Sequence, residues 1–125
     1  MTISKSRAKK IGQRIQEDLA QLLLQEADDP RLTMVTVTGA EVDRELAFAT
    51  IYVTAFDGDE RKEEILEALR GAKGFLRSQL AANIELRVFP RLRFRWDSTA
   101  ERAARIEDLL DQIHKDEERS EGEDG

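Results

Sequence analysis

Apolar residues recur at three- and four-residue steps over residues 5–26 and form a single stripe. The stripe consists of Ala8, Ile11, Ile15, Leu19, Leu22 and Leu23. This spacing predicts an amphipathic helix that buries one face. The helix should end before Asp28-Asp29-Pro30, because proline cannot continue a helix and biases the residue before it toward extended geometry.

The next two segments are rich in β-branched residues, as strands are. Residues 33–42 and 46–55 contain valine, isoleucine and threonine, and the short polar run 43–45 separates them. The threonines alternate with apolar residues. We therefore predict a hairpin whose sheet has one face more polar than the other.

Helical spacing returns after the break at Asp57-Gly58-Asp59. The apolar positions are Ile65, Leu69, Ala72, Leu76 and Leu80. Because this stripe keeps its phase through Gly71 and Gly74, we predict a helix that kinks near Gly74 and then resumes. A true glycine loop over residues 71–74 remains the alternative.

Residues 84–96 alternate strictly and predict a strand. The even positions carry Ile84, Leu86, Val88, Leu92, Phe94 and Trp96, and the odd positions carry Arg87, Phe89, Arg91, Arg93 and Arg95. Pro90 interrupts the pattern without changing its parity. We therefore expect an edge strand or a local break in the ladder.

A last helix should begin at the capping box Ser98-Thr99-Ala100-Glu101. Its apolar face would carry Ala103, Ile106, Leu109, Leu110 and Ile113. We predict a flexible terminus over residues 1–4, one domain over 5–114, and a disordered acidic tail over 115–125. The order of elements predicts an α+β fold in which helices pack on one face of a three-stranded sheet.

Charge is distributed unevenly along the 125 residues. The net charge is −6, yet residues 1–16 carry five cations and no acid, and residues 61–95 carry nine cations and four acids. A protein of this kind can contact phosphates with one face and repel them with another. There is no cysteine, no signal-peptide pattern and no apolar run long enough to span a membrane, so we expect a cytoplasmic protein.

Three groups of cations are candidates for contact with RNA. They are Lys5, Arg7, Lys9, Lys10 and Arg14 in the N-terminal segment, Lys73 and Arg77 beside the kink, and Arg87, Arg91, Arg93 and Arg95 on the odd face of the last strand. Arginine suits bidentate phosphate contacts, and Phe89 among the arginines could stack on an unpaired base. Amides that open a helix after Ala72 and Gly74 would face an incoming phosphate.

Each of these groups also has a purely structural interpretation. The arginine face could be a solvated surface that pairs with nearby acids, the N-terminal cations could serve only solubility, and Gly74 could merely accommodate a bend. Four arginines on one side of one strand favour an anion-binding surface over the structural alternative.

Catalytic constellations are missing from the sequence. His114 is the only histidine, it is expected at a helix end, and no phosphate-binding loop or dinucleotide fingerprint occurs. The aspartates at 28–29 and 57–59 are typical of turns. We therefore predict a protein that is not an enzyme, with no catalytic or metal-binding residues, no cofactor and no small-molecule substrate.

Several of these segments together resemble the ribosome-binding factor A family. The resemblance covers about residues 5–114. It rests on Asp29-Pro30-Arg31-Leu32, Val35-Thr36-Val37-Thr38, the segment Ala47 to Thr54, Ala72-Lys73-Gly74-Phe75-Leu76-Arg77, Arg87-Val88-Phe89-Pro90 with Leu92 and Phe94, and Asp97 with Arg105-Ile106. Gly71 and Ala103 depart from the family's pattern.

The resemblance implies a type II K-homology-like fold in which a kinked helix pair replaces the usual glycine loop. It further implies binding to the free or immature small ribosomal subunit near the decoding region. Assistance in late maturation and 5′-end processing of small-subunit rRNA, and support of growth in the cold, follow from the same resemblance. We expect a monomer. The alternative function is a protein-interaction module whose acidic region, residues 17–60 and the tail, binds a basic ribosomal protein.

Overall fold

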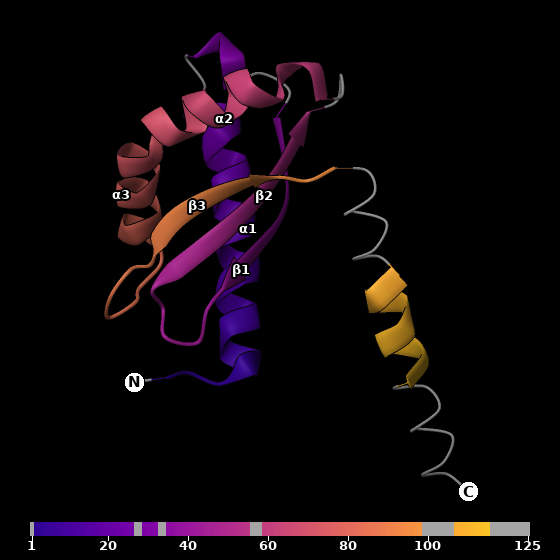
Figure 1. Ribbon diagram of the computed structural model, residues 1–125. Helices are drawn as coiled ribbons and strands as arrows, with labels where there is room; N and C mark the ends of the chain where they lie inside the picture. Colours follow the sequence, from indigo (N-terminus) through magenta and orange to yellow (C-terminus); the bar gives the residue numbers. More distant parts are fainter. Residues whose placement is uncertain (1, 27–28, 33–34, 56–58, 99–106, 116–125) are drawn as a thin grey trace, which may run out of the picture.

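The computed structural model describes residues 2–26, 29–32, 35–55, 59–98 and 107–115 (Figure 1). The elements in chain order are α1 (Lys5–Glu26), the short 3-10 helix η1 (Pro30–Leu32), β1 (Val35–Val42), β2 (Phe48–Ala55), a second 3-10 turn η2 (Asp59–Arg61), α2 (Lys62–Gly71), α3 (Lys73–Asn83) and β3 (Arg91–Trp96). A further helix spans residues 107–115. The predicted α+β fold with three strands is confirmed.

Helix α1 has the predicted bounds and buries the predicted stripe except for Leu22, which is partly buried. Ile15 and Leu19 are fully buried against the sheet. At the N-terminus of the helix, the Ser4 hydroxyl accepts a hydrogen bond from the Arg7 backbone N–H at 3.1 Å. This capping contact satisfies one of the amides that an α-helix leaves free in its first turn.

Gly12 marks a close approach between α1 and β1. A Cβ atom at this position would lie 2.5 Å from the Ala40 carbonyl oxygen of β1. Because glycine has no Cβ, the helix can lie directly on the strand.

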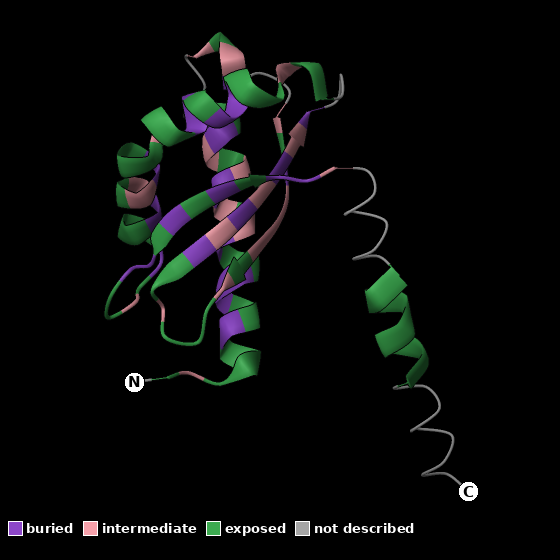
Figure 2. Cartoon of the chain, viewed as in Figure 1, coloured by how far each residue is buried: buried purple, intermediate pink, exposed green. Residues whose placement is uncertain are grey.

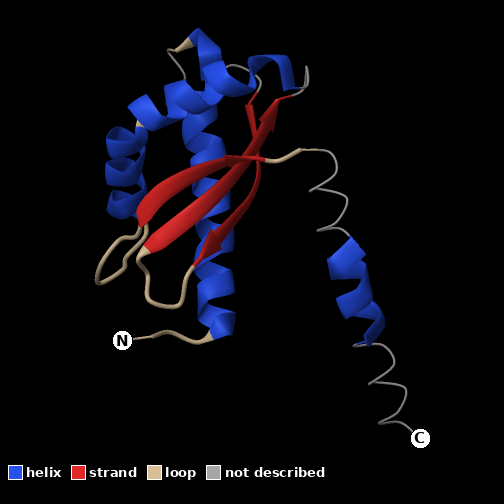
Figure 3. Ribbon diagram, in the orientation of Figure 1, coloured by secondary structure: helices blue, strands red, loops and turns tan. Residues whose placement is uncertain are grey.

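The three strands form one sheet in the order β1-β2-β3, with β1 antiparallel to β2 and β2 parallel to β3 (Figure 3). The parallel pair requires a crossover, which α2 and α3 provide. The register of β1 on β2 shifts between Val37 and Gly39, so Thr38 forms a bulge. The predicted hairpin is confirmed for the described residues; residues 33–34 of the first predicted strand lie outside them.

One face of the sheet is buried and the other is open (Figure 2). In β2 and β3, buried and more exposed residues alternate. The buried set, Ala49, Ile51, Val53, Leu92, Phe94 and Trp96, packs with α1, α2 and α3 in one core. The threonines of β2 lie on the opposite face, which confirms the predicted polar face.

Polar contacts fix the position of the end of β3. Asp97 is 1% exposed, and its Oδ2 accepts a hydrogen bond from the Thr38 hydroxyl at 2.5 Å. The Trp96 indole donates to Asp59 Oδ1 at 2.8 Å. The bulge in β1 thereby joins the far edge strand through a buried carboxylate.

The predicted strand over residues 84–96 is too long. Only residues 91–96 are paired, starting with the Arg91 amide, which donates to the Ala47 carbonyl at 3.0 Å. Residues 84–90 are irregular, and Pro90, which has no N–H to donate, is fully buried just before the strand. The expectation of an edge strand is confirmed, and the alternative, a break within the ladder, does not occur because the strand begins only after Pro90.

The kink between the helices lies at Ala72 rather than at Gly74. Ala72 has φ −90° and ψ 0°, and it ends α2 and precedes α3. Gly74 lies inside the first turn of α3. A Cβ at Gly71 or Gly74 would meet nothing within 4 Å of the protein, so neither glycine is required by a close contact. Residues 71–74 therefore form a kink of one residue and not a glycine loop.

The last helix does not extend the core. Its described part, residues 107–115, is exposed throughout and lies apart from the helices that cover the sheet (Figure 1). The capping residues Thr99 to Glu101, together with Ala103 and Ile106, lie outside the described residues. No helix in the described part of the chain combines the length and the apolar character needed to cross a membrane.

The N-terminal residues contact the hairpin loop. The Ile3 amide donates to the Arg44 carbonyl at 2.8 Å, and the Arg44 Nε atom donates to the Ile3 carbonyl at 2.8 Å. This contact lies within the segment 1–4 that was predicted to be flexible. The domain limits and the disorder of the acidic tail stay predictions.

Candidate nucleic-acid interface

The open face of the sheet carries three of the predicted arginines. Arg91, Arg93 and Arg95 are exposed, and the even residues between them are buried. The register places Arg93 beside Thr50 and Arg95 beside Tyr52 of β2. Side chains of neighbouring strands at such positions share one face. We call this surface, which comprises Arg91, Arg93, Arg95, Phe48, Thr50 and Tyr52, the open sheet face.

Phe48 supplies the aromatic surface of this face. The Arg93 guanidinium carbon lies 3.9 Å from the centroid of the Phe48 ring, which is a cation–π contact. Phe48 is 37% exposed, so solvent still reaches it. A planar guanidinium beside a partly exposed ring is suited to both phosphate and base contacts in single-stranded RNA.

The arginines of the open sheet face keep their charge available. No carboxylate among the described residues forms an ion pair with Arg91, Arg93 or Arg95. Two acids border this face: Glu41, whose Oε2 accepts a hydrogen bond from the Tyr52 hydroxyl at 3.4 Å, and Asp43, which lines the hollow beside Phe48 and Arg93. Positive charge on this face therefore gathers on β3, and the two acids that border the face lie in β1 and in the turn that follows it.

Phe89 does not lie among these arginines, contrary to the prediction. Its side chain is 7% exposed and belongs to the core. The irregular segment before Pro90 breaks the alternation on which the prediction relied. Arg87 is exposed in that segment and is not part of β3.

Arg77 holds the same segment in place. Its Nη2 atom donates to the Phe89 carbonyl at 2.6 Å, and its Nε atom donates to the Pro90 carbonyl at 3.2 Å. The guanidinium also lies 5.9 Å from the Phe89 ring centroid. Two of its donors are thus used inside the protein, which makes Arg77 a structural residue. Lys73, on the exposed first turn of α3, makes no such contact among the described residues.

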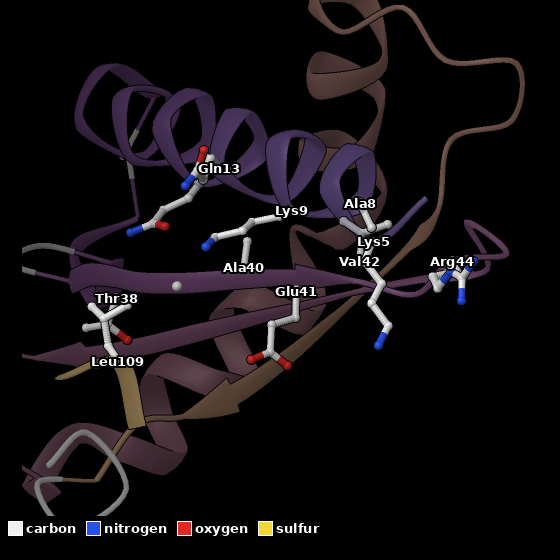
Figure 4. Close-up of a pocket in the computed structure, with 12 residues that line it drawn as sticks. Lys5, Ala8, Lys9, Gln13, Thr38, Ala40, Glu41, Val42, Arg44 and Leu109 are labelled. Carbon is white, nitrogen blue, oxygen red and sulfur yellow. The ribbon is translucent and has the colours of Figure 1, made fainter. Parts of the chain in front are cut away.

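The cations of the N-terminal segment point in different directions. Lys5 and Lys9 line a groove between α1 and β1 (Figure 4). Arg14 lies near α3, where it pairs with Asp18 at 3.2 Å and donates to the Asn83 carbonyl at 3.3 Å. The segment is therefore not one basic surface. Arg7 and Lys10 are exposed on α1 and line neither place.

The structure thus divides the predicted RNA-binding residues among several surfaces. Arg91, Arg93 and Arg95 come together, whereas Lys73, Arg87 and the N-terminal cations lie elsewhere. Sequence reasoning missed Phe48 and Tyr52. The alternation in β2 carried the signal, since Phe48, Thr50 and Tyr52 occupy the parity opposite to the buried Ala49, Ile51 and Val53.

The acidic residues do not form a metal site in the part of the chain that the structure describes, where no group of three or more potential ligands is gathered. Asp29 instead binds Arg31: its Oδ2 lies 2.8 Å from Nη2 and its Oδ1 lies 3.1 Å from Nε. These hydrogen bonds hold the pKa of Asp29 below its ordinary value and raise the pKa of Arg31. Asp28 and Asp57 lie outside the described residues.

Several known proteins that are similar to this chain carry one family name. A family model described as ribosome-binding factor A matches residues 7–110. A ribosome-binding factor A of Nitrosomonas europaea is 45% identical over 107 residues, which cover 86% of this chain and 92% of that protein. One of Shewanella sediminis is 40% identical over 121 residues, covering 96% of this chain and 85% of that protein.

Solved structures agree with this result. The crystal structure of ribosome-binding factor A from Thermus thermophilus has a TM-score of 0.63 and 30% identity, and the alignment covers 70% of this chain and 93% of that one. A Thermus thermophilus model of the same factor, fitted into an electron cryomicroscopy map of a 30S complex, has a TM-score of 0.59 and 32% identity over 70% of this chain and 92% of that one. The fold, the sequence and the match over residues 7–110 lead to one conclusion: the chain belongs to the ribosome-binding factor A family.

Proposed function

We propose that this protein is a non-enzymatic ribosome-biogenesis factor that binds the rRNA of the immature or free small ribosomal subunit. It acts in the cytoplasm as a monomer and assists late maturation and 5′-end processing of the small-subunit rRNA. Through that role it supports growth in the cold. The open sheet face makes the main contact with RNA.

The observation that carries the proposal is the cluster of unpaired arginines on that face. Arg91, Arg93 and Arg95 project from one side of β3, and no described carboxylate neutralises them. The chain as a whole is acidic, with a net charge of −6, so it needs such a local concentration of cations to approach RNA. The Phe48 ring beside Arg93 adds a stacking surface.

Family membership supports one class of RNA as the ligand. Relatives that are 40–45% identical carry the name ribosome-binding factor, and a related factor has been fitted into the map of a 30S complex. The electrostatic argument alone would suit many single-stranded or irregular RNAs. Family membership supports small-subunit rRNA among them.

Cosedimentation with purified small ribosomal subunits tests this surface. The variant Arg93→Gln with Arg95→Gln removes two charges from the open sheet face. We expect it to lose at least about tenfold in affinity, because each hydrogen bond to a charged group is worth roughly 1.5–3 kcal/mol where the partner is held in place. Both side chains are exposed, so the fold should be unchanged by circular dichroism and thermal unfolding.

The matched control removes two exposed cations from α2, Lys62→Gln with Arg70→Gln, at the same net charge. We expect wild-type binding from this control. Equal retention of both variants would reject the open sheet face as the binding surface. Capture that survives digestion of the RNA would instead favour the alternative, a protein-interaction module directed at a basic ribosomal protein.

A further inference from the structure

A groove runs between α1 and the exposed edge of β1, with a volume of about 1100 Å³ (Figure 4). Its lining combines apolar side chains with three cations and one acid. The residues used below are Ala8, Ala40, Val42, Lys5, Lys9 and Arg44. Lys9 and Gln13 extend from α1 toward β1 in this view. A ligand for this groove should therefore present an apolar strip bordered by negative charge.

Helix 107–115 has those properties. Leu109, Leu110 and Ile113 are 54%, 52% and 44% exposed, although their spacing places them on one side of the helix. An isolated helix of nine residues is marginal in water, because nucleation costs more than so few hydrogen bonds return. The apolar side of this helix therefore needs a surface to pack on.

One residue of this helix already reaches the groove, although the helix is exposed over its described length. Leu109 is one of the lining residues and lies near Thr38 at the bulge of β1 (Figure 4). The charges are also complementary. The helix carries Glu107, Asp108 and Asp111 against one lysine, and the acidic residues 116–125 follow it in the sequence. Across the groove stand Lys5, Lys9 and Arg44, with Glu41 as the only acid of the lining.

We propose that the C-terminal helix docks in this groove with Leu109 and Ile113 buried, and that the docked helix covers Lys5 and Lys9. The groove borders the open sheet face at Glu41 and Val42, which line both the groove and the hollow beside Phe48 and Arg93. The second half of the inference rests on the proposed function: a docked acidic helix competes with rRNA phosphates for the groove lysines and lowers the affinity for RNA.

The occupant is the chain's own helix rather than a second copy. Residues 99–106 connect the end of the sheet to the helix, and eight residues can span at most about 29 Å. A tether of this length gives an effective concentration on the order of millimolar. Docking therefore outcompetes association between molecules at the concentrations used in solution experiments.

Paramagnetic relaxation enhancement on the full-length protein tests the docking without RNA. Since the chain has no cysteine, Gln112→Cys gives a single site for a nitroxide label and leaves the charge unchanged. We expect strong broadening of the backbone amides that line the groove, above all near Ala8 and Ala40. Broadening should fall at least about threefold in Leu109→Gln with Ile113→Gln, which keeps helix propensity but removes the apolar side.

Three controls make the result decisive. Leu24→Gln removes another exposed leucine, 85% exposed on α1, and should leave the broadening unchanged. Lys9→Glu should weaken it, whereas Lys10→Glu, on the same helix but outside the groove, should not. Uniform weak broadening, or broadening that appears only between labelled and isotopically enriched molecules in a mixture, would overturn intramolecular docking.

The proposed competition between the docked helix and rRNA is tested by measuring the affinity for purified small ribosomal subunits. If the helix covers the groove in most molecules, Leu109→Gln with Ile113→Gln should raise the affinity roughly three- to tenfold, as expected when the fraction of competent molecules increases. If the docking is observed but this variant binds subunits with the wild-type affinity, the proposed competition is wrong. Complete absence of subunit binding by the wild type would instead refute the proposed function and leave the docking result standing.

Discussion

At the scale of single residues, Gly12 has a tighter steric environment than Gly71 or Gly74. Gly12→Ala places a Cβ atom 2.5 Å from the Ala40 carbonyl oxygen, well inside contact distance. Helix propensity favours alanine by about 1 kcal/mol, but the backbone of β1 must shift to admit the methyl group. We expect a net loss of about 1–3 kcal/mol in the free energy of unfolding, measured by urea denaturation.

Gly74→Ala is the matched control for that measurement. Gly74 lies in helix α3, and a Cβ there would meet no protein atom within 4 Å. Helix propensity is then the only effect of the substitution, and the free energy of unfolding should rise by up to about 1 kcal/mol. Shifts of the same sign in both variants would show that helix propensity, and not the contact with Ala40, governs Gly12.

The carboxyl group of Asp29 should titrate below the usual range, because the Arg31 side chain and backbone amide donate hydrogen bonds to it. A depressed pKa in the folded state means that this contact contributes stability above the unfolded pKa. That contribution is lost as the pH falls through the folded pKa. In Arg31→Gln, the pKa of Asp29 measured by NMR should return toward its ordinary value. An unchanged titration would contradict the role of Arg31.

At the scale of elements, Arg77 connects α3 to the irregular segment before β3. Arg77→Gln removes the hydrogen bonds to the Phe89 and Pro90 carbonyls and leaves both acceptors beside the buried Pro90 without their donor. We expect a loss of about 1–3 kcal/mol in the free energy of unfolding. Arg91→Gln, an exposed arginine one residue beyond Pro90, serves as the control and should change stability by less than about 0.5 kcal/mol.

Elements with a strong period could be predicted from the sequence. Helix α1 has the predicted bounds because Ile15 and Leu19 belong to one stripe that keeps its period from Ala8 to Leu23. The segment 84–90 could not be predicted, because its residues alternate in sequence without pairing with a neighbouring strand. Phe89 enters the core, and its backbone carbonyl is held by Arg77. Tertiary contacts override a local pattern in such cases.

The same distinction holds for the candidate site. Arg91, Arg93 and Arg95 were found because β3 is a regular strand with a buried opposite face. Phe48 joins them only through the parallel register of β2 on β3, which depends on a crossover of more than thirty residues that periodicity does not encode. Likewise, whether Ala72 or Gly74 ends a helix depends on the backbone angles at one residue.

At the scale of the whole molecule, the acidic composition and the RNA-binding proposal are reconciled by segregation of charge. The arginines of β3 stand on the open sheet face, whereas the β1 edge carries Glu41 together with the groove cations Lys5, Lys9 and Arg44. The helix layer separates the open sheet face from Lys73 and Arg14. RNA therefore meets a local cationic face on a molecule whose net charge is −6.

Salt dependence follows from this arrangement. Few phosphates can be neutralised at once, so the logarithm of the affinity should fall with the logarithm of salt concentration with a slope of about −0.7 for each phosphate contacted in single-stranded RNA. Replacing Arg93 and Arg95 by glutamine should make the slope less steep by about 1.4 if each contacts one phosphate. Replacing Lys62 and Arg70 changes the net charge equally but leaves the open sheet face intact, so the wild-type slope should persist. Titration of small subunits at several salt concentrations gives the slope for each double variant and so distinguishes them. If both variants reduced the slope alike, the net charge of the molecule, and not one cationic face, would control its approach to RNA.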